Sequence, residues 1–315
     1  MGFQHSAGES RVDTMRKQVS LGQMLGANLI TVGEVLLVAE SGAARADEIS
    51  QVFGPSHVFN DLQKAADVMV SGAGDYMLVM PKDDSAVWAL VADLDSTVFF
   101  AHFVGLTRAY QRPRISFTGA FDFDLSGNGV EVGFLDIVGN TADQEVLNSA
   151  GAGCWFHDCM FSAADGTAGA DVYSGGSQDT FDRCQFGDDY DHAVNANYID
   201  IAGSIRTFFN DCLFLNDAAA TTDFFCENHT AQTSIFRRCT FINQGSAAMD
   251  SAMNSTGSSP AFAHYCTVLG AAEWEDTASR SFVSPVGMGK TIAAGEVFNP
   301  GLALDGAGLT IGADT

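Results

Sequence analysis

The chain has 315 residues, with 15 Lys and Arg against 39 Asp and Glu and a formal net charge of −24. This balance argues against nucleic-acid binding, because a protein that holds DNA or RNA needs basic groups to replace the counterions of the phosphates. With 46% hydrophobic residues, 24 Phe, 33 Gly and only 6 Pro, we expect a folded, β-rich protein and exclude a disordered one.

The first 45 residues differ from the rest of the chain. Residues 2–18 carry Arg11, Arg16 and Lys17 and few large apolar groups, which is typical of a mobile arm. We expect residues 1–45 to supply this arm and a first strand. The three basic side chains would then attach the protein to a partner, and a strand tucked along the protein's own surface is the alternative.

The longest apolar run, residues 21–39, does not predict a membrane span, because polar residues and Glu34 interrupt it. It superficially resembles a signal peptide, since basic residues precede it and an Ala-x-Ala triplet follows at 44–46. The segment is roughly twice too long for that and carries Glu34 and Glu40. We therefore expect neither a membrane contact nor secretion by this route.

The segment 46–73 contains the best amphipathic helix. Asn60 is the expected N-cap of a helix within residues 58–69, and one face of it is apolar: Leu62, Ala65, Ala66 and Met69. A Gly-rich turn ends it before an apolar strand at 76–80. We expect this helix to cover the first open edge of the β-structure that follows.

A hexad of the form aromatic-x-x-Cys-x-apolar recurs through the second half of the chain. It occupies residues 156–161, 181–186, 209–214 and 236–241, and a degenerate copy occupies 263–268. Its cysteines, Cys159, Cys184, Cys212, Cys239 and Cys266, follow one another at steps of 25, 28, 27 and 27 residues. Such a period is the strongest signal in the sequence and indicates a repeat architecture.

The pattern within the hexad predicts strands with one inward face. The Cys and the apolar residue two positions later point to the same side, which makes Phe161, Phe186, Phe214 and Phe241 core residues. The first aromatic lies three positions before the Cys, so alternation breaks and a bend or bulge is expected between them. Leu135 repeats the form 24 residues before Cys159.

A unit of 25 to 28 residues with about three short strands buries its apolar side only by stacking on its neighbours. Propeller blades are longer, and the Leu and Asn frame of leucine-rich repeats is absent. We therefore predict an all-β fold: one parallel β-solenoid over residues 74–315, with roughly nine or ten coils. Segments 281–283 and 292–298 are expected to close the stack.

Stacking would also place the repeated cysteines in a column inside the solenoid. Their side chains would point the same way, whereas a disulfide needs them to converge, so reduced buried thiols are favoured over disulfides. Such a column suits a protein made in a reducing cytoplasm. His157 lies near Cys154 and Cys159 in the sequence, but Cys159 should face the core, so a packed thiol is favoured over a zinc ligand.

One acidic cluster follows the second hexad. Asp188, Asp189 and Asp191 could together hold a hard cation. In so acidic a chain, a solvated turn is the preferred interpretation. Hence we expect no cofactor, no metal and no catalytic residue. A concave position beside His192 or Arg206 would favour chemistry instead.

The order of a helix, a Gly-rich turn, Asp75, an apolar strand and Pro81 resembles the opening of the pectin-lyase-like right-handed parallel β-helices. More narrowly, residues 76–81 followed by 104–106, 112–117 and the later hexads are similar to β-helical proteins of tailed-phage virions. The similarity extends over about residues 30–270. It implies a role at the virion surface or in assembly and carries no catalytic residue over.

Three functions stay open. The leading expectation is a non-enzymatic virion protein, a capsid decoration, head spike or fibre on the particle exterior. Capsid or tail proteins would be its partners, and it would form a homotrimer or another symmetric oligomer made in the host cytoplasm. The first alternative is a tailspike-like protein that binds or depolymerises a polysaccharide, with paired carboxylates. The second is a cellular or secreted β-helix of adhesin type.

Overall fold

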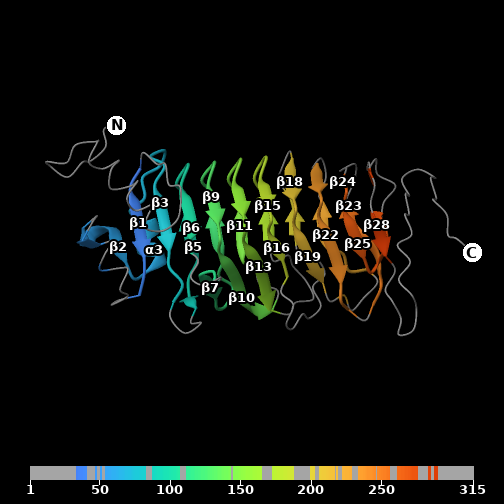
Figure 1. Ribbon diagram of the computed structural model, residues 1–315, viewed down its shortest axis with the longest axis horizontal. Coiled ribbons are helices and arrows are strands. Elements are labelled where there is room, and N and C mark those ends of the chain that lie inside the picture. Colours follow the sequence, from blue (N-terminus) through green and yellow to red (C-terminus); the bar gives the residue numbers. More distant parts are fainter. Residues whose placement is uncertain are drawn as a thin grey trace, which may run out of the picture.

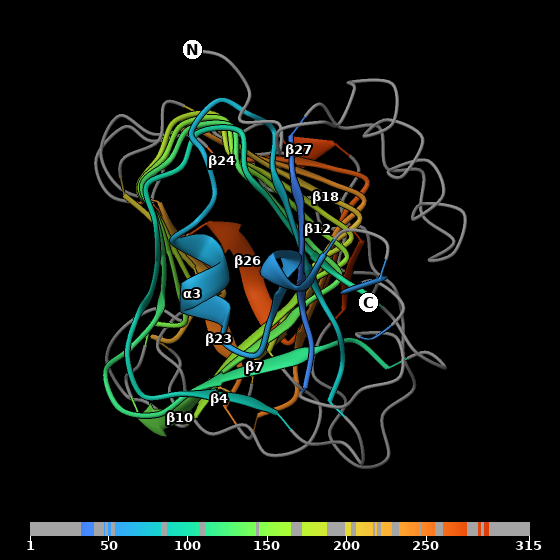
Figure 2. The same cartoon turned by 90° about the vertical axis from the view of Figure 1, so that its left-hand side faces the viewer.

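The computed structural model is a stack of coils whose strands form three parallel sheets around one core (Figures 1 and 2). The residues that it describes are 33–40, 47, 50–51, 54–82, 87–106, 111–142, 145–164, 172–187, 199–202, 206–216, 218, 222–228, 233–245, 247–255, 261–275, 283–284 and 287–289.

Sheet A is the largest of the three. In spatial order it contains β2 (Val58–Phe59), β1 (Val35–Val38), β3 (Tyr76–Val79), β6 (His102–Gly105), β9 (Glu131–Gly133), β12 (Trp155–His157), β15 (Thr180–Asp182), β18 (Thr207–Asn210), β21 (Ser234–Arg237), β24 (Ala261–His264) and β27 (Val283–Ser284).

Sheets B and C follow the same order along the stack. Sheet B contains β4 (Trp88–Leu90), β7 (Arg114–Phe117), β10 (Asp136–Ala142), β13 (Met160–Ala164), β16 (Gln185–Phe186), β19 (Leu213–Asn216), β22 (Thr240–Asn243), β25 (Thr267–Leu269) and β28 (Gly287–Gly289). Sheet C contains β5 (Leu94–Ser96), β8 (Phe123–Leu125), β11 (Leu147–Ser149), β14 (Val172–Ser174), β17 (Ile199–Ile201), β20 (Cys226–Asn228), β23 (Met249–Ser255) and β26 (Ala271–Glu275).

Each coil gives one strand to sheet A, one to sheet B and one to sheet C. Equivalent residues pair across coils, for example Phe156 with Phe181 on sheet A and Phe161 with Phe186 on sheet B. Within the described residues the stack holds eight complete coils, from β3–β5 to β24–β26, and β27 and β28 begin a ninth. The all-β parallel solenoid predicted from the repeat is confirmed.

The hexad is the corner at which the chain passes from sheet A to sheet B. Phe156 lies on β12, Phe161 lies on β13, and Asp158 between the two strands has a φ of 54°. The equivalent residues of the next coils, Arg183, Asp211 and Arg238, have φ values of 53°, 55° and 54°. In each of these coils, one residue with left-handed backbone, a conformation that side chains rarely adopt, therefore makes the bend that the broken alternation predicted.

Two columns of phenylalanine rings fill the core beside this corner. Stacked neighbours on sheet A have ring centroids 4.6 Å apart for Phe156 and Phe181, and 5.1 Å apart for Phe181 and Phe209. On sheet B, Phe161 stacks on Phe186 at 5.5 Å. Since each of these rings is fully buried, the stack removes a large apolar area from water at every coil.

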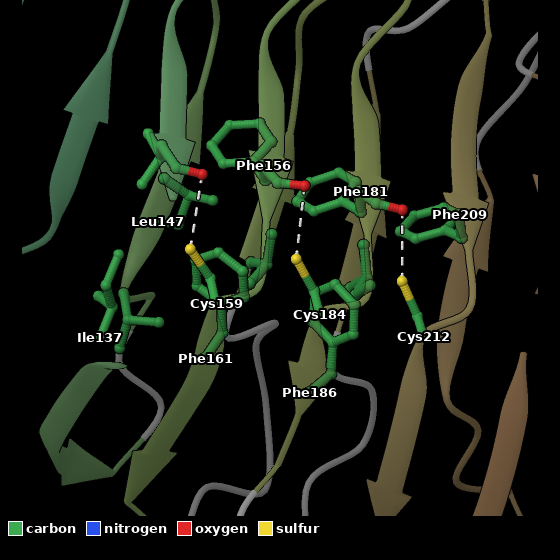
Figure 3. Close-up of a cluster of buried hydrophobic side chains, with 14 of the residues drawn as sticks. Ile137, Leu147, Phe156, Cys159, Phe161, Phe181, Cys184, Phe186, Phe209 and Cys212 are labelled. Atoms are coloured by element: carbon green, nitrogen blue, oxygen red, sulfur yellow. Dashed lines mark hydrogen bonds between the residues drawn. The ribbon is translucent and has the colours of Figure 1, made fainter. Parts of the chain in front are cut away.

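The repeated cysteines occupy the space between the two columns (Figure 3). From Cys159 to Cys239, the Sγ points along the stack at a backbone carbonyl of the preceding coil. Cys184 lies 3.5 Å from the oxygen of Phe156, and Cys212 lies 3.3 Å from that of Phe181. All seven cysteines are buried and free. Burial raises the pKa of thiols such as Cys159 and Cys184, so these thiols are neutral.

The first end of the stack is covered by a short helix, α3 (Leu62–Ala66), which lies across the opening in Figure 2. Its residues Leu62, Ala65 and Ala66 are buried in the same core as the Phe columns. The helix is shorter than the predicted segment, because it ends at Ala66 with Asp67 as its C-cap. Residues 58–59, before the helix, pair with β1 as a strand. A 3₁₀ turn, η1 (Pro55–His57), precedes this strand.

The expected N-cap is wrong by one position. Asp61, not Asn60, accepts a hydrogen bond from the backbone N–H of Lys64 at 3.1 Å. The backbone of Asp61 is extended, with φ −145° and ψ 127°, as a capping residue requires. In the described part of the chain, no helix has the length and apolar character that a membrane crossing would need.

Candidate functional site

The outer surface of sheet A carries a concentration of polar and aromatic side chains. On every strand of sheet A from β3 to β24, the residues on either side of the central inward residue, most often a Phe, point outward. Two rows therefore cross the strands. The first is Tyr76, His102, Glu131, Trp155, Thr180, Phe208, Ile235 and Phe262. The second is Leu78, Val104, Gly133, His157, Asp182, Asn210, Arg237 and His264.

Glu131 on β9 lies between two histidines. Its Oε1 accepts a hydrogen bond from Nε2 of His157 at 2.9 Å, and its Oε2 is hydrogen-bonded to Nδ1 of His102. The ring of His102 also stacks on Tyr76, with centroids 4.0 Å apart. Partial burial favours the neutral acid, but the two histidines outweigh it and lower the pKa of Glu131 to about 2. Glu131 is therefore a fixed negative charge.

His157 is packed on every side. Its Nδ1 donates to Asp158 at 3.0 Å, Trp155 lies against its ring at 4.2 Å, and Phe134 meets it edge-on at 5.1 Å. Only 5% of the residue is exposed. Burial disfavours the charged ring, but the carboxylates of Glu131 and Asp158 outweigh it and raise the pKa of His157.

Another carboxylate, Asp182 on β15, lies one coil beyond His157. Asp182 accepts hydrogen bonds from Nε1 of Trp155 at 2.7 Å and from the amide nitrogen of Asn210 at 2.7 Å. The indole of Trp155 thus links His157 to Asp182, since its ring lies against His157 and its N–H donates to Asp182. Because Trp155 is 40% exposed, it offers a flat apolar surface to a ligand beside both of them.

Ion pairs line the corner beside this face. Arg183 donates two hydrogen bonds to Asp158, of 2.9 and 2.6 Å. Arg238 donates two to Asp211 in the same bidentate way, of 2.7 and 2.6 Å. Charges therefore alternate along the corner, from Asp158 through Arg183 and Asp211 to Arg238. The guanidinium of Arg238 lowers the pKa of Asp211.

The sequence-predicted site residues are not part of this cluster. The column Cys159, Cys184, Cys212, Cys239 and Cys266 lies in the core, together with Phe161, Phe186, Phe214 and Phe241. The acidic candidates Asp188, Asp189 and Asp191 lie outside the described residues, as do the attachment candidates Arg11, Arg16 and Lys17. Among the residues that the structure describes, no group of three His, Cys, Asp or Glu side chains is arranged to hold a metal ion.

The residues of the sheet A face escaped sequence reasoning because they do not repeat. His102, Glu131, Trp155 and Asp182 stand in four different coils, and no motif links them. The sequence signal that could have found them is their position relative to the hexad. Since each hexad begins with an inward aromatic, its two flanking residues must point outward, and Trp155 with His157 is the most unusual of these pairs.

No protein-family model matches the chain, and a search of curated proteins finds no match. Among solved structures it is similar to the deglycosylated pectin methylesterase of Aspergillus niger, with a TM-score of 0.55 and 11% identity over 83% of this chain and 86% of that one. It is also similar to a pectin methylesterase mutant in complex with a hexasaccharide, with a TM-score of 0.51 and 11% identity over 78% and 81%.

These likenesses show the fold, a pectin-lyase-like right-handed parallel β-helix. They also correct two expectations. The chain was expected to be non-enzymatic, and this is overturned because both neighbours are enzymes. The comparisons also favour the alternative, a protein that acts on a polysaccharide, over the leading expectation of a structural role in a virion, since both similar structures are pectin methylesterases and neither is a virion protein.

Proposed function

We propose that the protein is a polysaccharide-modifying hydrolase that binds its glycan on the outer face of sheet A. Two kinds of support converge on this function. The fold is shared with pectin methylesterases, one of them solved with a hexasaccharide. Independently, the sheet A face brings together the two things that such an enzyme needs, a platform for sugar rings and an oriented base.

The platform is Trp155 with its neighbours. Sites for small ligands combine aromatic surface with a few well-placed polar groups that fix orientation. The exposed indole supplies the surface, while Asp182 and Asn210 supply hydrogen-bonding oxygen and nitrogen atoms on the next two coils. Sugar rings have apolar C–H faces and hydroxyl rims, so they match this arrangement.

The base is His102, and its relation to Glu131 is the observation that carries the proposal. The carboxylate holds Nδ1 of the ring, and within the described residues Nε2 has no hydrogen-bond partner. A carboxylate-oriented imidazole with one free nitrogen is the arrangement that general-base catalysis uses. The His102 side chain is 24% exposed, so water can reach it.

We assign the chemistry as hydrolysis of an ester on a substituted polysaccharide. Nε2 of His102 takes a proton from water, and the water oxygen bonds to the ester carbonyl carbon. The bond from this carbon to the alkoxy oxygen then breaks, and the proton on the ring passes to the leaving alcohol. The products are an alcohol and a carboxylic acid, which releases its proton to the solvent and becomes a carboxylate.

The test is a panel of polysaccharides carrying methyl esters or acetyl groups, each paired with its unsubstituted form. Released methanol, released acetate and new reducing ends are measured. We expect ester hydrolysis that His102→Ala reduces by about 10²-fold or more. The matched control is His264→Ala, which changes another outward histidine of sheet A and should leave the rate intact. Absence of hydrolysis across the panel, or full activity of His102→Ala, would overturn the proposal.

A further inference from the structure

A continuous chain of charged groups crosses sheet A and ends at the proposed base. Arg183 donates to Asp158, Asp158 accepts from Nδ1 of His157, Nε2 of His157 donates to Glu131, and Glu131 holds His102. These groups belong to four successive coils.

His157 is the middle of this chain and bonds at both ring nitrogens. Both face carboxylate oxygens, which only accept hydrogen bonds, so both nitrogens carry protons and the ring is an imidazolium. The charged groups that face it are Glu131 from β9 and Asp158 from its own corner; Trp155 and Phe134 cover the rest of the ring with apolar surface.

We propose that His157 is a positioning residue that acts on His102 through Glu131. A buried cation anchors one oxygen of the carboxylate, so the other oxygen stays aimed at Nδ1 of His102 and keeps the proton there. Nε2 of His102 is then the nitrogen without a proton, which is the form that a base requires. This role rests on the proposed function only where catalysis is concerned, because the tautomer of His102 is a property of the free protein.

The chain supplies its own control for the outer end of this network. Asp211 occupies the same corner position as Asp158, with a φ of 55° against 54°, and it is gripped in the same bidentate way by Arg238. The residue before it is Asn210, where Asp158 has His157. The two Asp–Arg pairs therefore differ in their contact with a histidine.

The first experiment compares Asp158→Asn with Asp211→Asn by NMR titration of nitrogen-15-labelled histidines. Asn tolerates the left-handed backbone, so both variants keep the corner. We expect the titration midpoint of His157 to fall by about one unit in Asp158→Asn, which removes a contacting carboxylate, and to stay unchanged in Asp211→Asn. Equal midpoints in the two variants would overturn the coupling.

The second experiment reads His102 directly. In the wild-type protein, the nitrogen-15 shifts of the neutral His102 ring should show Nδ1 protonated and Nε2 bare. His157→Leu should mix the two tautomers, and His157→Gln, whose amide can still donate to Glu131, should restore the wild-type pattern. An unchanged tautomer in a folded His157→Leu protein would overturn the proposal.

Activity then separates the two ideas. With an ester substrate, His157→Leu should lower kcat about tenfold or more with little change in KM, and His157→Gln should recover part of the loss. If no substrate is hydrolysed but the tautomer results hold, the proposed function fails and the positioning role stands. If hydrolysis needs His102 but not His157, the reverse is true.

Discussion

Gly133 on β9 lies directly against the imidazole ring of His157 on β12. A Cβ atom at position 133 would come within 2.4 Å of Cε1 and 2.5 Å of Nε2 of that ring. We expect Gly133→Ala to displace the ring from Glu131 and to lower the free energy of unfolding by about 1–3 kcal/mol, since the clash forces a packed side chain to move. Urea denaturation measures this loss.

A double-mutant cycle isolates the cause. In a His157→Ala background the ring is absent, so Gly133→Ala should cost much less than in the wild-type background. If the substitution costs the same in both backgrounds, the glycine is needed for the backbone of β9 and not for the ring of His157.

Phe208 and Phe209 stand side by side on β18 and point to opposite faces. Phe209 is fully buried and stacks on Phe181 at 5.1 Å and on Phe236 at 4.7 Å, whereas Phe208 lies partly exposed on the sheet A face. We expect Phe209→Ala to lower the free energy of unfolding by about 3–5 kcal/mol, because it breaks the stack and leaves a cavity. Phe208→Ala, the matched control, should cost under about 1 kcal/mol. Equal losses in denaturant titrations would contradict the assignment of the two faces.

The sequence predicted the core of this fold because the inward residues repeat. Each coil buries its residue in the same place, as Phe209 and Phe181 show. The same residue type therefore returns once per coil, and this period can be seen directly in the sequence. The corner was predictable for the same reason, since the residue before the Cys, Asp158 in the first hexad and Arg183 in the second, interrupts the alternation each time. The strands of sheet C carry no shared aromatic, and for this reason their register could not be predicted.

The candidate site could not be predicted, because its residues are brought together by stacking. His102 and Glu131 lie 29 residues apart in the chain and meet only because β6 and β9 are neighbours. The predicted helix N-cap was wrong by one residue. Asn60 and Asp61 both have side chains that can cap, and the choice between them depends on a backbone angle that composition does not reveal.

The seven buried cysteines should be unreactive in the folded protein. Burial raises the pKa of thiols such as Cys159, Cys184 and Cys226, and the thiolate is the form that attacks a disulfide reagent. We expect a colorimetric thiol assay to detect almost no reaction in buffer and all seven thiols in denaturant without reductant. Fewer than seven after unfolding would mean that some cysteines are paired. Rapid reaction in the native protein would mean that the column is accessible.

Asp179, between the coils, is a buried carboxyl that should make stability depend on pH. It is 0% exposed and is held by the hydroxyls of Ser149 and Ser174 and the backbone N–H of Cys154. Burial outweighs these hydrogen bonds and raises its pKa from 3.8 to about 6. Because the folded protein binds this proton more tightly than the unfolded chain, stability should fall as the pH rises from about 4 to about 6.

Asp179→Asn keeps a neutral group of the same shape, so it should remove this slope. The variant should be more stable than the wild type at pH 7 by about 3 kcal/mol, which is the shift of about two pKa units expressed as free energy. Urea denaturation between pH 4 and pH 8 measures both effects, and Asp250→Asn, at an exposed position on β23, controls for the loss of one charge. A slope that Asp179→Asn leaves unchanged would mean that the carboxyl is ionised in the core. Its two serine hydroxyls and one N–H would then be enough to hold a buried charge.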